Sequence, residues 1–488
     1  MGTIRQQGII NTLIIYTGVV IGFLNTIVIQ PKFLSVDEVG LTRILISFSG
    51  LLTPFFLLGG SSMCVRFFPA FRNDEKRHHG FMGLLLLFPL TGILIGSLII
   101  WMFKERIIAS YADESPLFVN YFSHVLPLAA VMTLATSINA YSNSLFKTVF
   151  PSFLNDVWVR ILLIVFTLLY SFQYISLDWY VNGIVITYFA QLLSIAVYVI
   201  SVDRPSLKID FTFVRSVGSG KIISYALLLT LTALSSLSLK FLDTVMIGAY
   251  LPLKFVGIYS IGAFIAQFIE TPLYALERVA GVKVAAAMET RNMKEVDEIY
   301  KQSVKYMLFA GGFLVSGVIV CVQDFLMLLP VEYRGAAIVT VIMSVGSLIN
   351  MATGVNNPII NNSGKYYYSL IFLFLLLIIS VVLNAILIPE LGIAGAAIAT
   401  ASAASLYNLM KFIFIYRNFR LQPYNTASLL NILVICISSA LFFIIPSAFS
   451  PIINILVKGI SVTLCYAGLS YMFKIMPDLK MFFRKKQL

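Results

Sequence analysis

Hydrophobic residues along the chain form fourteen blocks, each about 20 residues long, separated by short polar segments. A helix of that length crosses the hydrocarbon core of a bilayer, and its backbone polar groups pair within the segment. The blocks occupy residues 8–30, 39–64, 80–103, 117–141, 153–172, 179–202, 221–250, 255–283, 304–328, 336–358, 366–389, 392–416, 427–447 and 451–473. They predict an all-α polytopic membrane protein, and the first block, which is too long for a typical secretory leader, is interpreted as a retained span.

Composition and charge support this class and set the predicted orientation. Of 488 residues, 59% are hydrophobic and 11% are charged, whereas soluble domains carry about 25% charged residues. Most of the 34 lysines and arginines, Arg160 and Lys411 among them, fall on or near the side of the two termini. That side is therefore predicted to be cytoplasmic. Because the basic residues are scattered over many short loops, the net charge of +12 indicates membrane topology and not a nucleic-acid surface.

Two segments of the chain repeat one another. Residues 33–41 and 250–258 share Leu, Val and Gly in matching positions, and both predict a tight outer turn before a helix. A weaker match joins residues 183–186 with residues 395–398. The offset covers six helices, an even number, so the repeats would be parallel and related by an axis along the membrane normal, a geometry typical of transporters.

The repeat predicts the domain organisation. A six-helix lobe would occupy residues 1–203, a cytoplasmic linker residues 204–220 and a second six-helix lobe residues 221–420. Residues 421–488 would add two transmembrane helices and a basic cytoplasmic tail.

Five of the charged residues inside predicted spans stand out: Arg43, Lys240, Asp243, Glu270 and Lys458. Each costs at least about 2.5–3.5 kcal/mol on insertion scales and so requires a reason. Lys240 and Asp243, three residues apart, can neutralise each other on one helix face. Arg43 and Lys458 can extend toward the outer headgroups. Glu270, short and near the midplane, needs a cationic partner, a proton or an aqueous cavity.

Asparagines crowd the inner end of the tenth predicted span, at positions 350, 356, 357, 361 and 362. They can line a polar mouth, or they can serve only as loop and helix-cap residues. Gly59-Gly60 is a weak point that can act as a hinge or only as a kink. Asn292 with Glu295 resembles a capping box and predicts an interfacial helix in the largest cytoplasmic connection, with partner docking as the alternative.

Motifs of enzymes are missing from the sequence. It contains no complete P-loop, HExxH or GxSxG motif, and its three histidines are given no catalytic role. The four cysteines lie singly in apolar blocks and are interpreted as packing residues. We expect no enzymatic activity, no metal and no cofactor.

Three segments carry a resemblance to a known family. They are residues 34–41 with 57–60 and 66–69; Asp243 with residues 247–248, 256–260 and 272–273; and residues 384–389 leading into 392–400. Over residues up to about 416, the chain resembles polysaccharide-biosynthesis transporters of the O-antigen flippase type. These belong to the multidrug/oligosaccharidyl-lipid/polysaccharide exporter superfamily.

The resemblance implies alternating access and an undecaprenyl-diphosphate-linked oligosaccharide as cargo, flipped to the outer leaflet for O-antigen, capsule or exopolysaccharide synthesis. It also implies the bacterial cytoplasmic (inner) membrane as location. Membrane lipids, a glycan polymerase and glycosyltransferases would be the partners, and no nucleic acid is expected.

Such cargo fits the charged residues inside the spans, because a diphosphate needs cations along its path. Arg43, Lys240 and Lys458 are the candidate cations. Asp243 and Glu270 are candidates for binding a coupling H⁺ or Na⁺, or for balancing the cations. Two alternatives stay open. A cation-coupled multidrug exporter would favour an acidic, aromatic cavity, and in a non-transporting scaffold of a glycan-synthesis complex the charges would be structural.

Overall fold

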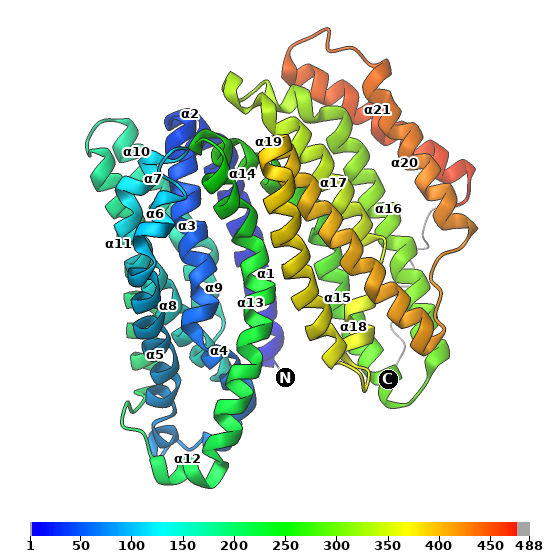
Figure 1. The fold of residues 1–488 in the computed structure, drawn as a ribbon. Coiled ribbons are helices and arrows are strands. Elements are labelled where there is room, and N and C mark those ends of the chain that lie inside the picture. Colours follow the sequence, from blue (N-terminus) through cyan, green and yellow to red (C-terminus); the bar gives the residue numbers. More distant parts are fainter. Residues whose placement is uncertain (1, 476–488) are drawn as a thin grey trace. The chain divides into compact units, whose positions relative to one another are not determined.

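The computed structural model describes residues 2–475, without the side chains of residues 2–6, 9, 227, 231–233 and 235–238. Over this range the regular elements are all helices, which confirms the predicted all-α class (Figure 1). The chain divides into two compact units, Met1–Gly257 and Ile258–Leu488, which we describe separately as unit 1 and unit 2. The end of the predicted basic tail, residues 476–488, lies outside the described residues.

Unit 1 contains the first thirteen α-helices and four short π- or 3₁₀-helical segments. In chain order these are α1 (Gly2–Phe23), η1 (Leu24–Ile29), α2 (Gln30–Phe33), α3 (Val36–Leu57), α4 (Gly60–Phe71), η2 (Arg77–Gly80), α5 (Phe81–Met102), α6 (Lys104–Ala109), α7 (Pro116–Tyr121), η3 (Phe122–His124), α8 (Val125–Ser144), α9 (Val149–Phe153), η4 (Leu154–Trp158), α10 (Val159–Ser171), α11 (Leu177–Asp203), α12 (Phe211–Val217) and α13 (Ser219–Tyr250). Helix α14 (Leu253–Gln267) begins in this unit.

Unit 2 contains the rest of α14 and the elements that follow it. These are η5 (Phe268–Glu270), α15 (Thr271–Glu289), α16 (Met293–Leu326), η6 (Val331–Gly335), α17 (Ala336–Met351), α18 (Asn356–Asn361), α19 (Tyr367–Phe419), α20 (Thr426–Ile444) and α21 (Pro451–Met472).

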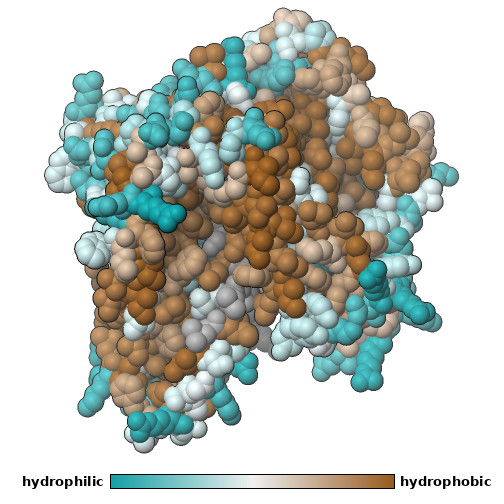
Figure 2. All heavy atoms as spheres, in the orientation of Figure 1, coloured by the Kyte–Doolittle hydropathy of each residue, from teal (hydrophilic) through white to brown (hydrophobic). Residues whose placement is uncertain are grey.

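The described helices account for the fourteen predicted spans. Twelve helical segments of the described chain are long and apolar enough to cross a membrane. One of them, Tyr367–Phe419, bends at Gly392 (φ 62°, ψ −140°) and so supplies two spans. Helix α13 adds the last, since its 32 residues extend about 48 Å at about 1.5 Å per residue. On the face drawn in Figure 2, apolar side chains cover the lengths of the spanning helices in each unit, with hydrophilic ones gathered at the helix ends.

The two repeated turns pack against each other within unit 1. A Cβ atom on Gly40 would lie 2.2 Å from the Leu253 carbonyl oxygen, and one on Gly257 would lie 2.6 Å from the Val36 carbonyl oxygen. The start of α3 and the start of α14 therefore approach so closely that neither position has room for a side chain. This reciprocal contact gives a physical reason for the glycine shared by residues 33–41 and 250–258.

Two other local expectations are decided by the structure. The weak point at Gly59-Gly60 is a break: Leu58 (φ 44°) and Gly59 (φ 71°) are left-handed and separate α3 from α4. The predicted cap is confirmed, because the Asn292 side chain accepts the Glu295 backbone N–H at 3.3 Å. The helix that starts there is not a separate interfacial helix, however, since α16 continues without a break to Leu326.

The compact units do not coincide with the predicted lobes. Helix α13, which the repeat assigns to the second lobe, packs along α3 and α4 and belongs to unit 1. The side chain at Phe241 of α13 contacts α3 at Gly50, and Gly248 of α13 lies against Ile44. The lobe boundaries at residues 204–220 and 421 stay a prediction.

Candidate functional site

Arg43 of α3 is oriented toward the segment that joins α1 to α2 in unit 1. Its Nη2 atom donates to Thr26 Oγ1 at 2.9 Å and to Gln30 Oε1 at 2.6 Å. Thr26 lies in η1, which is π-helical, and π-helical turns are frequent at functional sites. The two contacts fix one edge of the guanidinium group, which is half-buried.

Arg160 is a candidate site residue that the sequence analysis missed, because it was counted with the basic residues on or near the cytoplasmic side. It lies in the middle of the candidate span Val149–Ser171, four residues after Asp156. Its Nη1 atom donates to the carbonyl oxygen of Gly18 in α1. A Cβ atom on Gly22, one turn further along α1, would lie 2.5 Å from that Nη1 atom. Gly22 therefore leaves a groove in α1 that holds the arginine, and Gly18 leaves room for Asp156, whose carbonyl oxygen would lie 2.6 Å from a Cβ atom there.

Lys240 of α13 adds a third positive charge in unit 1. Its side chain is exposed, and its charge interacts with those of Arg160 and Asp156. Arg43 and Arg160 lie in the same unit, and the charges of both act on the Tyr188 side chain of α11. We name Arg43, Arg160 and Lys240 the cationic cluster. It is a concentration of charge inside membrane-spanning helices, where isolated charges are costly.

The two predicted carboxylates lie in different units. Asp243 is buried on α13, one turn after Lys240. Glu270, in η5 of unit 2, is half-buried and accepts hydrogen bonds from Tyr274 Oη at 2.9 Å and Asn350 Nδ2 at 3.1 Å. Two side-chain donors thus hold the Glu270 carboxylate.

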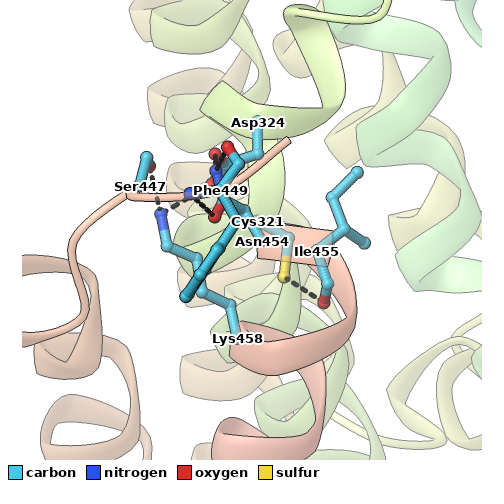
Figure 3. Close-up of polar contacts among 7 residues, drawn as sticks. All are labelled: Cys321, Asp324, Ser447, Phe449, Asn454, Ile455 and Lys458. Atoms are coloured by element: carbon cyan, nitrogen blue, oxygen red, sulfur yellow. Dashed lines mark hydrogen bonds and ion pairs between the residues drawn. The ribbon is translucent and has the colours of Figure 1, made fainter. Parts of the chain in front are cut away.

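Lys458 of α21 forms a buried ion pair within unit 2 (Figure 3). Its Nζ atom lies 2.6 Å from Asp324 Oδ2 of α16, and the two side chains are 3% and 0% exposed. Ser447 Oγ accepts a further bond from Lys458 at 2.9 Å, and Asn454 Nδ2 donates to Asp324 Oδ1 at 2.9 Å. These contacts neutralise the charge of Lys458 within unit 2. We therefore interpret the Lys458–Asp324 pair as a structural link between α16 and α21. The role of Lys458 as a substrate cation stays a prediction.

The asparagine-rich end of the tenth span borders a cavity in unit 2. The cavity is open to the surface and has a volume of about 640 Å³, and Asn357, Asn361, Tyr274, Glu277 and Arg278 line it together with apolar residues. This volume lies within the range of small-molecule pockets. The lining is consistent with the predicted polar mouth.

The described residues contain no group of three or more His, Cys, Asp or Glu side chains that could hold a metal ion. The candidate site residues described above are charged and amide side chains, which form ion pairs and hydrogen bonds.

Comparisons with known proteins show the fold. No protein-family model matches the chain, and no curated protein matches its sequence. Among solved structures, the lipid II flippase MurJ in an inward closed conformation aligns with 98% of this chain and 100% of its own, with a TM-score of 0.73 and 16% identity. An inward-facing multidrug-resistance MATE-family transporter of the MOP superfamily aligns with 84% of this chain and 98% of its own, with a TM-score of 0.63 and 15% identity. The MATE multidrug transporter DinF-BH gives a TM-score of 0.56 at 17% identity, over 86% of this chain and 97% of its own.

The matched structures are a flippase and two transporters. Identities of 15–17% establish the architecture and leave the cargo to the chemistry of the site. The chain is thus a multi-pass membrane protein with the fold shared by the MurJ flippase and the MATE transporters.

Proposed function

We propose that this chain is a secondary transporter that flips polyprenyl-diphosphate-linked oligosaccharides across a bacterial cytoplasmic membrane by alternating access. Undecaprenyl-diphosphate-linked repeat units of O-antigen, capsule or exopolysaccharide are the cargo, and both termini lie in the cytoplasm. A glycan polymerase and glycosyltransferases would be its functional partners.

The cationic cluster is the observation that carries this proposal. Arg43, Arg160 and Lys240 place three positive charges in the spans of unit 1, where insertion of each is costly. Arginine matches diphosphate oxygens with two parallel hydrogen bonds, which are about twice as strong as neutral ones. Two of the three side chains are half-buried and one is exposed, so none of them is enclosed as Lys458 is.

The competing exporter function has support from the MATE-like fold. A carrier for cationic drugs, however, would be expected to surround its cargo with carboxylates, whereas two cations of the cluster in unit 1, Arg160 and Lys240, act on the single carboxylate of Asp156. A non-transporting scaffold would carry the same charges only as structural pairs.

Complementation of a deletion strain tests the proposal. We expect the deletion to abolish surface glycan, and Arg43→Ala, Arg160→Ala and Glu270→Gln to fail to restore it while lipid-linked repeat units remain in the cytoplasmic leaflet. Lys104→Ala, at an exposed lysine outside the cluster, is the matched control and should restore display. A deletion strain that becomes sensitive to drugs but still displays normal surface glycan would contradict the proposal and favour an exporter.

A further inference from the structure

Lys411 of α19 is a buried cation for which the proposed transport mechanism has so far no use. Its side chain is 1% exposed. Its Nζ atom donates to Asn356 Oδ1 at 3.1 Å and to Asn357 Oδ1 at 3.0 Å, and lies 4.0 Å from the centre of the Tyr407 ring. An ammonium group has three N–H donors, so two amide oxygens and one aromatic face enclose it. Among the described residues, no carboxylate oxygen lies within 4.0 Å of this nitrogen.

The first of these amides links Lys411 to a carboxylate. Asn357 accepts from Lys411 with its oxygen and donates from its nitrogen to Glu277 Oε1 at 3.1 Å. The amide dipole is therefore oriented with its negative end toward the ammonium and its positive end toward the carboxylate. Glu277 and Asn357 also line the cavity of about 640 Å³ described above.

The second amide starts a longer chain with the same polarity. Asn356 Nδ2 donates to Asn408 Oδ1 at 3.4 Å, and Asn408 Nδ2 donates to Asn350 Oδ1 at 3.1 Å. Asn350 Nδ2 then donates to Glu270 Oε2 at 3.1 Å. Each amide presents its oxygen toward Lys411 and its nitrogen toward Glu270, an order in which hydrogen bonds polarise one another.

The two chains surround the ammonium with the chemistry of an alkali-cation site. Hard cations bind amide and carboxylate oxygens. Here α18 supplies both amide oxygens at the charge. The asparagines of α17 and α19 continue one chain, and the two carboxylates at the chain ends come from η5 and α15. The charge of Lys411 interacts with both Glu277 and Glu270. The Lys411 ammonium, which is covalently attached to α19, therefore takes the position in which a free alkali cation would otherwise bind.

We propose that Lys411 is the resident cation of unit 2, occupying the oxygen-lined position that a free Na⁺ would take, so that the transport cycle does not require Na⁺. This inference rests on the proposed function for its transport part only. Of the two candidate coupling ions, it excludes Na⁺ and keeps H⁺ as the ion that couples to transport.

Thermal unfolding of the purified full-length protein in NaCl or choline chloride, at equal ionic strength, tests the inference without any transport. The wild type should unfold at the same temperature in both salts. Lys411→Ala should show a saturable rise in unfolding temperature with NaCl, because Na⁺ can then enter the vacated position and bind the folded state. Lys365→Ala, at an exposed lysine of the same unit, should respond like the wild type.

Two results would overturn the resident cation: a saturable Na⁺ stabilisation of the wild type, or a folded Lys411→Ala variant that does not respond to Na⁺. If Lys411→Ala does not fold, binding of radioactive ²²Na⁺ to the wild type decides the matter. Sodium bound in proportion to the protein would contradict the inference, whereas the absence of bound sodium would support it.

Flipping in proteoliposomes is the second arm, with lipid-linked repeat units extracted from the native strain as the probe. The wild type should flip them equally well in Na⁺ and in choline, and Lys411→Ala should be at least about tenfold slower in choline. Flipping by the wild type only in Na⁺ would overturn the inference. Flipping in neither salt would contradict the proposed function, and the unfolding measurement would still decide the role of Lys411.

Discussion

The two units solve the problem of charge inside a membrane in opposite ways. In unit 1, Arg43, Arg160 and Lys240 are half-buried or exposed. In unit 2, Lys411 and Lys458 are 1% and 2% exposed, and described side chains satisfy their ammonium groups. An enclosed charge contributes to structure or to the internal electrostatics of its unit, whereas an accessible one can bind a ligand that comes and goes.

This difference sorts the cations that the sequence presents as equivalent. Arg43, Lys240 and Lys458 all carry a positive charge within a predicted span. Lys458 forms an ion pair with Asp324 at 2.6 Å, whereas Lys240 is exposed. The burial of each cation, more than its presence in a span, therefore separates structural pairs from candidate ligand groups. Four predictions test this separation.

The largest effect is expected at the enclosed pair of unit 2. Asp324→Ala leaves Lys458 buried without its carboxylate and should cost about 3–5 kcal/mol of unfolding free energy. The matched control is Asp297→Ala on the same helix, whose partner Lys301 is 50% exposed, and it should cost at most about 1 kcal/mol. Denaturant unfolding in detergent measures both values. Equal losses would show that enclosure does not distinguish the two pairs.

The next effect concerns the accessible cations of unit 1. Arg160→Ala removes a guanidinium that can bond a diphosphate and should weaken binding of undecaprenyl diphosphate about 10- to 100-fold, corresponding to about 1.5–3 kcal/mol. Arg160→Lys keeps the charge but cannot form two parallel hydrogen bonds, so its dissociation constant should lie between those of Arg160→Ala and the wild type. Titration of the lipid into protein held in nanodiscs provides the dissociation constants. An unchanged constant for Arg160→Ala would remove this residue from the ligand site.

A smaller effect tests how the arginine is held. Gly22→Ala places a methyl group 2.5 Å from the unmoved Arg160 Nη1 atom, so the side chain must shift. We expect a loss of about 1 kcal/mol in unfolding free energy and severalfold weaker binding of undecaprenyl diphosphate. Gly8→Ala is the control, since nothing lies within 4 Å of its Cβ position. Identical behaviour of the two variants would show that the groove in α1 does not position Arg160.

The smallest effect lies outside the spans, at Asp210. A hydrogen bond with His79 Nδ1 at 3.1 Å, followed by a bond from the Phe213 backbone N–H, lowers the pKa of this carboxyl group below its usual value. A lowered pKa in the folded state stabilises the fold above the unfolded value of about 3.9, and this contribution is lost as the pH falls through the folded value.

Asp210→Asn should therefore lower the unfolding temperature slightly at pH 7, and its difference from the wild type should shrink as the pH falls below the unfolded value of about 3.9 and through the lower folded value. Thermal scans of both proteins from pH 7 to pH 3 measure this difference. A difference that persists unchanged at the acidic end would contradict an electrostatic contribution of Asp210.

The sequence predicts the helices well because their signals are local. Hydropathy locates the spans, the Asn292–Glu295 pair marks the start of α16, and the repeated glycines at positions 40 and 257 mark a close approach. Each signal lies within one segment, or in two segments of matching pattern. The break at Leu58–Gly59 follows equally from two adjacent glycines.

The site residues are harder to predict, because their meaning depends on partners far away in the sequence. The sequence analysis interprets Arg160 and Lys411 only as markers of membrane topology. Their roles become visible when the structure places α1 beside Arg160 and the asparagines around Lys411. Asp324 lies inside an apolar block, so window-averaged hydropathy conceals it. Its partner Lys458 is 134 residues away, a distance across which no local pattern extends.

The central claim is that the cations of unit 1 carry a diphosphate-linked glycan across the membrane. Its most direct test is the flipping of native lipid-linked repeat units by purified protein in proteoliposomes, detected with a membrane-impermeant oxidant of sugar diols. We predict flipping by the wild type and at least about a tenfold loss in the Arg43→Ala/Arg160→Ala double variant. Equal flipping by the wild type and the double variant, or none by the wild type, would contradict the claim.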